Sequence, residues 1–200
     1  MTIFFILITV LVSIYAFTKR KVFEGLKFNA YAIHHEKQWY RFFSYGLIHA
    51  DWVHLLINMY VLWSFGEIVE LLMKYHFGTK GYLYYGLLYI GGIAFSTLYD
   101  YGKHKDNAYY NAVGASGAVS AVVFSSIILY PAGKIYLVFI QIGIPSVILG
   151  ILYLVYSAYM ARRGSDNIGH NAHFWGAVYG AVFTIILKPS LFVELINNIF

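Results

Sequence analysis

The stretch DWVHLLINMYVLWSFGEIVELL, residues 51–72, is an apolar segment of helical length with polar side chains near its start. His54 and Asn58 are four residues apart, so they share one face of the expected helix. A polar or ionisable side chain at membrane depth costs free energy, and such a residue is by default a candidate for a functional site. The segment therefore predicts a membrane protein with a polar site inside it.

The composition of the whole chain favours the same class. Of the 200 residues, 60% are apolar and 12% are charged, and the mean hydropathy is +0.64, whereas about a quarter of the residues of a soluble domain are charged. The chain has no cysteine, which excludes disulfides, iron–sulfur clusters and thiolate metal sites. Its basic residues lie in the expected loops, where they suit anionic lipid headgroups, and we expect no nucleic-acid partner.

Six apolar segments predict an all-α polytopic membrane protein, a six-helix bundle that forms a single domain over residues 1–200. Residues 19–50 are aromatic and charged, and we expect them to lie folded at the membrane interface. Pro131 and Gly133 would end the fourth helix. The first segment lacks the basic start and the cleavage site of a signal peptide, so we expect a membrane helix there. The expected helices are about 2–18, 51–72, 81–99, 116–130, 135–160 and 172–187.

Polar residues on the second, fourth and sixth segments are expected at a similar depth, because these three helices run the same way across the membrane. The stretch from Ser116 to the end of its segment is about 22 Å long at ~1.5 Å per residue, and the stretch from His173 is about as long. From Asn58 to Glu70 the length is about 18 Å. A hydrocarbon core of about 30 Å then places all three polar positions roughly 8–12 Å below one surface. Hydrolysis at that depth would need a cavity filled with water.

The tetrapeptide Gly114-Ala115-Ser116-Gly117 opens the fourth segment. Gly114 permits a tight turn of the backbone. Ser116 would then present its hydroxyl at a helix N-terminus, where free N–H groups and the helix dipole favour the negative charge of an oxyanion. The alternative is a face of small residues that only packs against another helix, since Ala121 and Ser125 follow at helical spacing.

The sixth segment opens with Ala172-His173-x-x-Gly176-x-x-x-Gly180. The histidine and both glycines share one helix face, and glycines on a face let another helix approach closely. If that helix is the fourth, His173 lies beside Ser116. A histidine is the natural base for a serine hydroxyl near neutral pH. The alternative is an interfacial histidine without a chemical role.

His54 and Asn58 on the second segment can both donate hydrogen bonds to a developing oxyanion. The alternative for this pair is a hydrogen bond to a neighbouring helix. His49 falls on a different face from His54, and we expect it to form structural hydrogen bonds.

A metal site is another possible use of the histidines. It would combine His49 and His54 with His173 or His170, but no carboxylate or cysteine stands at ligand spacing and no HExxH motif occurs. The acids inside segments lie at the far end of the second helix, so a paired-aspartate mechanism has no residues. We therefore expect no metal and no cofactor, and we expect His170 to be a solvated loop residue.

Three motifs taken together resemble those of the rhomboid family of intramembrane serine proteases, in its basic six-helix bacterial form. Arg41, Gly66 and Glu70 look like further family positions. The three motifs occur in the family's order and on the corresponding helices, and the resemblance covers nearly the whole chain. They are His49-x-x-x-x-His54-x-x-x-Asn58, Gly114-Ala115-Ser116-Gly117 and Ala172-His173-x-x-Gly176-x-x-x-Gly180.

The resemblance implies a serine endopeptidase with Ser116 as nucleophile and His173 as general base, without an acidic third member. It implies an oxyanion hole formed by His54, Asn58 and the Ser116 N–H, with His49 holding the first loop and the fourth helix together. The implied reaction cleaves transmembrane segments of single-pass membrane proteins through an acyl-enzyme intermediate.

The resemblance also implies a setting in the membrane. The fifth helix and the 161–171 loop would form the substrate gate and cap, and the 19–50 loop would lie sideways in the interface. The protein would be a multi-pass protein of the cell (inner) membrane, its site opening to the outer face and its partners being membrane protein substrates and the lipid bilayer. That topology puts four of the fourteen Lys and Arg residues inside, the reverse of the positive-inside rule. Sidedness and oligomeric state stay open.

Two positions depart from the family pattern, and the minor departure is that the first loop reads Trp39-Tyr40-Arg41 where a Trp-Arg pair is usual. Ser120, one turn after the expected nucleophile, stands where family members often carry an aromatic ring that packs on the histidine. We expect a residue such as Phe124 or Trp175 to hold the base instead. Two other functions remain as alternatives: a client-binding relative without activity, against which Ser116 and His173 argue, and a small channel or carrier, which would be expected to show internal repeats.

Overall fold

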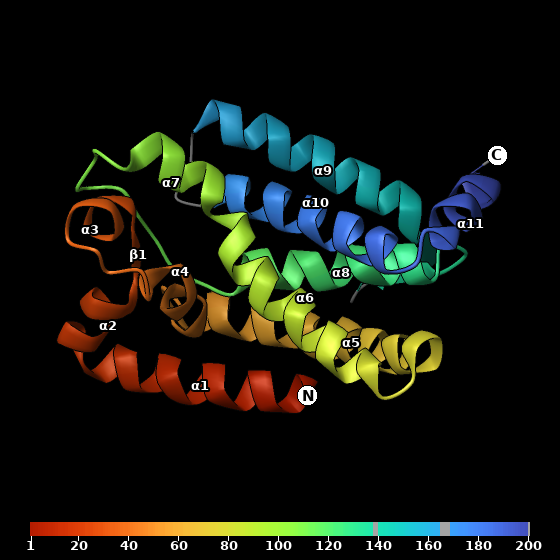
Figure 1. The fold of residues 1–200 in the computed structure, drawn as a ribbon, viewed down its shortest axis with the longest axis horizontal. Coiled ribbons are helices and arrows are strands. Elements are labelled where there is room, and N and C mark those ends of the chain that lie inside the picture. The colour runs from red at the N-terminus through yellow and green to blue at the C-terminus, as the bar shows by residue number, and fades with distance from the viewer. Residues whose placement is uncertain (138–139, 165–168, 200) are drawn as a thin grey trace.

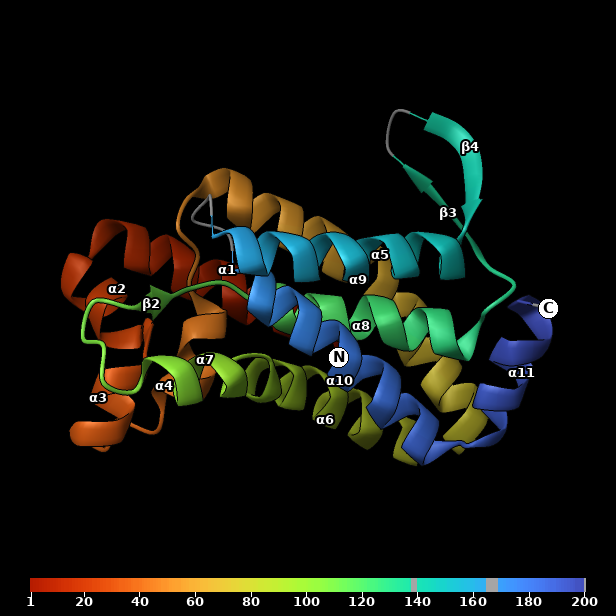
Figure 2. The ribbon, with the colours of Figure 1, turned by 90° about the horizontal axis from the view of Figure 1, so that it is seen from above.

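The structure, a computed structural model, describes residues 1–137, 140–164 and 169–199 and is mostly helical. Its longer helices form a bundle in which α8 lies inside, in contact with α5, α6, α9 and α10 (Figures 1 and 2). Helix α1 packs on the outer side of α5, and α9 lies on the other side of the bundle (Figure 1). These helices are α1 (Thr2–Thr18), α5 (Trp52–Phe77), α6 (Lys80–Ser96), α8 (Ser116–Leu129), α9 (Ser146–Arg163) and α10 (His170–Leu187).

Most helix boundaries fall close to those expected from the sequence. Helix α5 starts where the side chain of Asp51 accepts a hydrogen bond from the His54 N–H at 2.8 Å. It runs five residues beyond the expected end and stops at Gly78, whose φ of 61° suits a glycine. The expected third helix breaks at Thr97 into α6 and the short α7 (Leu98–His104).

The connection between α1 and α5 is folded into short elements. Arg41 is buried, and its guanidinium donates to the backbone carbonyls of Glu24 and Lys27 at the end of α2. Strand β1 pairs with β2 in antiparallel register, which ties this connection to the segment just before α8. The elements are α2 (Arg20–Leu26), β1 (Phe28–Asn29), α3 (Ala30–His35), α4 (Arg41–Ser44), η1 (Tyr45–Leu47) and β2 (Asn111–Ala112).

The expected fifth helix is wrong over its first part, because residues that were assigned to it form a β-hairpin (Figure 2). Strands β3 (Lys134–Leu137) and β4 (Ile140–Pro145) pair antiparallel, and α9 begins only at Ser146. The stretch is rich in β-branched isoleucine, which favours strands. Pro145 has no N–H to donate, so a helix cannot pass through it without losing a hydrogen bond.

The chain also continues past the expected sixth helix. Helix α10 begins two residues earlier than expected, and Lys188 and Pro189 separate it from α11 (Ser190–Ile199). The axes of α10 and α11 differ by 119°. Leu191 is fully buried, whereas Phe192 and Val193 are exposed.

Two expected family positions on α5 hold α1 in place. Glu70 accepts hydrogen bonds from the backbone N–H and the hydroxyl of Thr2, both at 2.9 Å. A Cβ on Gly66 would lie 2.6 Å from the Tyr85 hydroxyl and 2.7 Å from Thr2 Cγ2. A glycine at position 66 is therefore needed for α1 and α6 to approach α5 this closely.

Among the described helices, α5 alone is long and apolar enough to cross a bilayer by itself. The bent pair α10–α11 passes the same test if it is counted as one broken span, and α1 and α8 are apolar but shorter. The helical character of the fold agrees with the sequence, whereas six membrane crossings and an interfacial 19–50 loop stay predictions.

Candidate active site

The residues before Ser116 form a tight, buried turn. Gly114 has a φ of 111°, which disfavours any residue with a side chain. A Cβ there would lie 2.5 Å from His54 Cε1 and 2.8 Å from its Nε2, so the imidazole packs directly against this turn. The Gly114 N–H donates to the Tyr45 carbonyl at 3.0 Å. Ser116 is the first residue of α8 and is partly exposed.

His49 joins three elements at this turn. The backbone N–H of Ala115 donates to His49 Nε2 at 3.3 Å, so Nε2 must be the unprotonated nitrogen. The proton is then on Nδ1, which donates to Ser13 Oγ at 3.0 Å, and the serine hydroxyl in turn donates to the Leu47 carbonyl. Burial is the main cause that lowers the pKa of His49 from 6.5 to about 3. A neutral imidazole thus links α1, the first connection and the start of α8.

The starts of α8 and α10 lie together because glycines line the contact between the two helices. A Cβ on Gly176 would lie 2.1 Å from the Gly117 carbonyl oxygen, and one on Gly180 would lie 2.1 Å from that of Ala121. Near the N-termini of both helices, a Cβ on Gly117 would lie 3.3 Å from the carbonyl oxygen of Ala172. The helix contact expected from the glycine spacing is therefore present.

This contact brings together the chain segments that carry Ser116 and His173. Gly117 follows Ser116, and Ala172 precedes His173 in the sequence. Both predicted catalytic residues are partly exposed, each at or near the N-terminus of its helix. Because Gly117 and Ala172 are in contact, the N-terminal ends of α8 and α10 adjoin.

Ser96 is a site neighbour that the sequence did not indicate. A Cβ on Gly117 would lie 2.3 Å from Ser96 Oγ, so glycine at 117 makes room for this buried side chain. Ser96 Oγ is also within 2.9 Å of the Tyr45 hydroxyl, which donates to the carbonyl of Ile93. The end of α6 thereby supports the first turn of α8.

The two predicted oxyanion donors lie on the same side of α5. Asn58 is buried, and its Nδ2 donates to the His54 carbonyl at 2.9 Å. An amide nitrogen carries two hydrogens, so this bond leaves one more for another acceptor. The His54 ring lies 5.0 Å from that of His49. The structure thus places His54 at the turn that leads into Ser116, with Asn58 one helical turn further along α5.

Two rings lie near that of His173: the imidazole of His170, with its centroid 5.9 Å away, and a tyrosine ring from α9. Tyr153 lies with its ring centroid 6.3 Å from that of His173 and with an angle of 21° between the planes. Trp175, the other residue expected near the base, is exposed and stacks on Tyr99. Phe124 lies with its ring centroid 5.9 Å from that of Tyr153, so it contacts the tyrosine ring rather than replacing it. The proximity of Tyr153 to His173 depends on how α9 packs, and no local sequence pattern signals it.

The start of α10 is anchored to α7 by a buried acid. Asn171 Nδ2 donates to Asp100 Oδ1 at 2.9 Å, and Asp100 is 1% exposed. Burial raises the pKa of Asp100, while hydrogen bonds from Tyr110 and Asn171 act in the opposite direction. His170 is buried and lies against the Tyr156 ring, so the expectation of a solvated loop residue is wrong.

In the part of the chain that the structure describes, no three His, Asp or Glu side chains are grouped closely enough to hold a metal ion.

Of the expected 161–171 cap, residues 165–168 lie outside the described residues. A pocket of about 170 Å³ adjoins the start of α10. Its lining residues are Lys103, His104, Tyr110, Met160, Ala161, Gly164, Gly169, His170 and Asn171.

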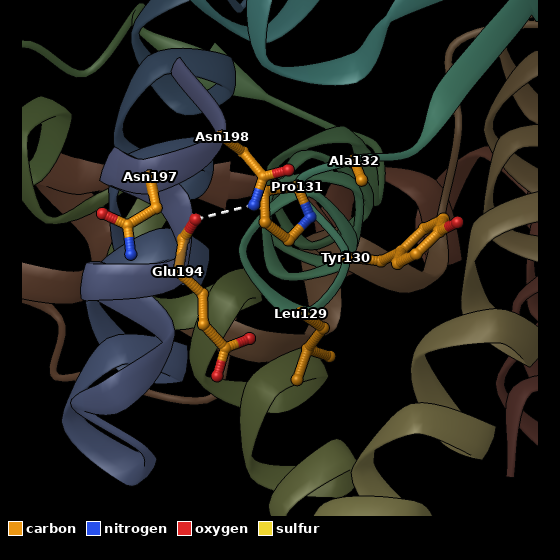
Figure 3. A pocket seen from close by; sticks show the side chains of 7 residues that line it. All are labelled: Leu129, Tyr130, Pro131, Ala132, Glu194, Asn197 and Asn198. Atoms are coloured by element: carbon orange, nitrogen blue, oxygen red, sulfur yellow. Dashed lines mark hydrogen bonds between the residues drawn. The ribbon is translucent and has the colours of Figure 1, made fainter. Parts of the chain in front are cut away.

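A larger pocket, of about 380 Å³, lies at the opposite end of α8, between that helix and α11 (Figure 3). At ~1.5 Å per residue it is about 20 Å from Ser116 along the helix. The Asn198 side chain donates to the backbone carbonyl of Glu194 beside it (Figure 3). The pocket between α8 and α11 is therefore separate from the predicted site at Ser116. Its lining residues are Leu129, Tyr130, Pro131, Ala132, Glu194, Asn197 and Asn198.

Comparison with known proteins gives consistent matches. Residues 36–190 match the family model described as "Rhomboid domain". The chain is 30% identical over 152 residues to RHOMBOID-like protein 12, mitochondrial, of Arabidopsis thaliana, an alignment that covers 72% of this chain and 45% of that protein. It is 31% identical over 176 residues to Rhomboid-like protein 11, chloroplastic, of the same plant, covering 82% and 58%. The chain spans about half the length of these curated relatives.

Proposed function

Since this chain belongs to the rhomboid family, we propose that it is an intramembrane serine protease in which Ser116 and His173 carry out the reaction. The observation that carries the proposal is the contact between Gly117 and Ala172, which are the sequence neighbours of these two residues. Glycines at 176 and 180 keep the two helices at this distance. A serine hydroxyl needs an adjacent base to become a nucleophile, and an imidazole is suited to that role.

In the proposed reaction, Ser116 Oγ attacks the scissile carbonyl carbon while His173 accepts the hydroxyl proton. The C–N bond then breaks, and the leaving amine receives that proton from His173. Water hydrolyses the resulting acyl-enzyme, again with His173 as the base, and Ser116 regains its proton. No acidic third residue takes part.

The oxyanion formed in each step would be stabilised by three donors: the Ser116 backbone N–H, His54 and Asn58. The first N–H groups of a helix have no partner within the helix, and the helix dipole favours negative charge there. His54 packs against the Gly114 turn, two residues before the nucleophile. His49 supports this arrangement by accepting the N–H of Ala115.

The substrates would be transmembrane segments of single-pass membrane proteins. A helix hides its carbonyl groups in internal hydrogen bonds, so a cleavable segment must unwind near the scissile bond. Segments with small or helix-breaking residues near one membrane face meet this need. The enzyme itself would be a multi-pass membrane protein of the cell membrane whose site opens to the outer face.

The proposal is tested by co-expressing the chain with a tagged single-pass reporter and comparing the wild type with Ser116→Ala and His173→Ala at equal membrane levels. Both substitutions are expected to abolish cleavage. Ser126→Ala is a matched control, because this serine is on the same helix and donates to the Val123 carbonyl. Labelling of the purified protein by a fluorophosphonate probe, lost in Ser116→Ala, reports the nucleophile without depending on the choice of reporter. Cleavage that survives Ser116→Ala would overturn the proposal.

A further inference from the structure

Helix α9 contributes the side chain of Tyr153 to the surroundings of the proposed base. The Tyr153 ring lies nearly parallel to the imidazole of His173, with the centroids 6.3 Å apart. Its hydroxyl lies 2.7 Å from Ser120 Oγ, at hydrogen-bond distance. Ser120 is buried on α8, one turn after Ser116. Tyr153 therefore bridges α8 and α10 at the level of the proposed catalytic pair.

A small residue at position 120 is what makes room for this arrangement. Ser120 is 5% exposed, and a side chain much larger than serine would occupy the space that holds the Tyr153 hydroxyl. Phe124, one turn further along α8, lies with its ring 5.9 Å from that of Tyr153 and packs against it at an angle of 45°. The tyrosine is thus held at its hydroxyl by Ser120 and along its ring by Phe124.

The position of this ring depends on where α9 lies. Helix α9 is at the edge of the bundle, beside α10 and α8 (Figures 1 and 2). It follows a hairpin and ends at Gly164, which has a left-handed φ of 58°. The side chains on its outer face are exposed and apolar or aromatic. They are Ile148, Ile151, Leu152, Val155, Tyr156 and Tyr159.

We propose that Tyr153 is a positioning residue for His173: its ring fixes the orientation of the imidazole, and its hydrogen bond to Ser120 fixes the ring. This inference rests on the proposed function, in which His173 is the base. Stacked aromatic side chains attract one another beyond the area that they bury. A base has to be aligned with the proton that it accepts, so loss of the ring slows the chemical step more than it weakens substrate binding. The alignment of the base is thereby made dependent on the position of α9.

The kinetic test compares Tyr153→Leu, Tyr153→Phe and Ser120→Ala with the wild type. Tyr153→Leu removes the ring and is expected to lower kcat and the rate of fluorophosphonate labelling by about three- to tenfold, with KM little changed. Tyr153→Phe keeps the ring and is expected to retain most of the wild-type activity, unlike Tyr153→Leu. Tyr153→Phe combined with Ser120→Ala should lose no more than either alone, because both remove the same hydrogen bond.

Tyr159→Leu is the matched control, because this tyrosine lies on the same helix and is exposed. It is expected to leave both rates unchanged. An equal loss in Tyr159→Leu and Tyr153→Leu would overturn the inference, since it would indicate general damage to α9. Full activity of Tyr153→Leu would overturn it too, while leaving the proposed protease function intact.

A second measurement does not depend on activity. In protein labelled with ¹³C-histidine, the His173 resonance is identified by its absence in His173→Ala. A neighbouring ring shifts this resonance, so Tyr153→Leu should move it and Tyr159→Leu should not. A resonance that stays in place in Tyr153→Leu would overturn the inference. The wild type could also neither cleave the reporter nor bind the probe while Tyr153→Leu still moves the His173 resonance. That result would show that the contact exists and that the proposed function has failed. The catalytic part of the inference would then be overturned.

Discussion

The imidazole of His49 accepts a hydrogen bond from the backbone N–H of Ala115 across 3.3 Å. Sixty-six residues separate the two in the sequence, and Ala115 directly precedes the proposed nucleophile. On its other side the imidazole is held by the hydroxyl of Ser13 on α1. The orientation of the first turn of α8 is therefore set in part by a side chain in the loop before α5.

Removal of this imidazole should destabilise the protein. In His49→Leu the N–H of Ala115 loses its acceptor in a buried place, which costs about 1–3 kcal/mol. We expect a lower midpoint of thermal unfolding in detergent and reduced fluorophosphonate labelling. His35→Leu is the control, because His35 is exposed and its ion-pair partner, Asp106, is exposed as well. Equal midpoints for His49→Leu and the wild type would contradict this prediction.

The same histidine predicts a pH dependence of stability. Its pKa is about 3 in the folded protein against 6.5 for a free histidine, so the folded state binds fewer protons between these values. Its contribution is complete above pH ~6.5 and decreases as the pH falls toward 3, by up to about 1.4 kcal/mol per pH unit. At pH 5 the loss is about 2 kcal/mol relative to pH 7. His49→Gln, which does not titrate, should lose less stability over this range.

The comparison is made by measuring unfolding of both proteins in detergent at pH 7 and pH 5. All other titratable groups are common to the two proteins, so the difference between them isolates position 49. The same loss of stability in both would show that protonation of His49 does not contribute.

Gly180→Ala should separate α10 from α8. Its Cβ would lie 2.1 Å from the carbonyl oxygen of Ala121, which is backbone and cannot rotate away. We expect loss of proteolysis and a fall in the thermal midpoint. Gly102→Ala is the matched control, because a Cβ there meets nothing within 4 Å. It lies within a helix and should raise stability slightly, by about 0.4–1 kcal/mol. If Gly180→Ala were as stable and active as Gly102→Ala, the proposed role of the helix contact would be wrong.

Gly114→Ala tests the turn before Ser116. The substitution strains a φ of 111° and also places a methyl group 2.5 Å from His54 Cε1. Gly164→Ala separates these effects, because Gly164 has a φ of 58° but nothing within 4 Å. Backbone strain alone costs about 1–2 kcal/mol. We expect Gly164→Ala to lose only stability and Gly114→Ala to lose fluorophosphonate labelling as well. Normal labelling of Gly114→Ala in folded protein would refute the arrangement proposed for His54.

The differences between expectation and structure have local physical causes. The prediction of the fifth helix was wrong over its first part because an apolar run is compatible with a buried helix and with a strand. Pro145 was the only strong sign of a helix boundary in that run. His170 was expected in a loop, yet it is the first residue of α10 and is buried beside Tyr156. Hydropathy measures the transfer of a segment into an apolar phase, and it does not report which polar side chains the tertiary structure buries.

The sequence by itself determined the helical class of the chain, its family and the residues proposed for catalysis. These follow from residue type and short spacing: glycines four residues apart, and a serine or a histidine at the start of an apolar segment. Only the tertiary structure decided which side chains support them. The contact of His49 with Ala115, that of Tyr153 with His173 and that of Asn171 with Asp100 each join residues far apart in the chain. Such pairs leave no local pattern, because their proximity comes from the packing of whole helices.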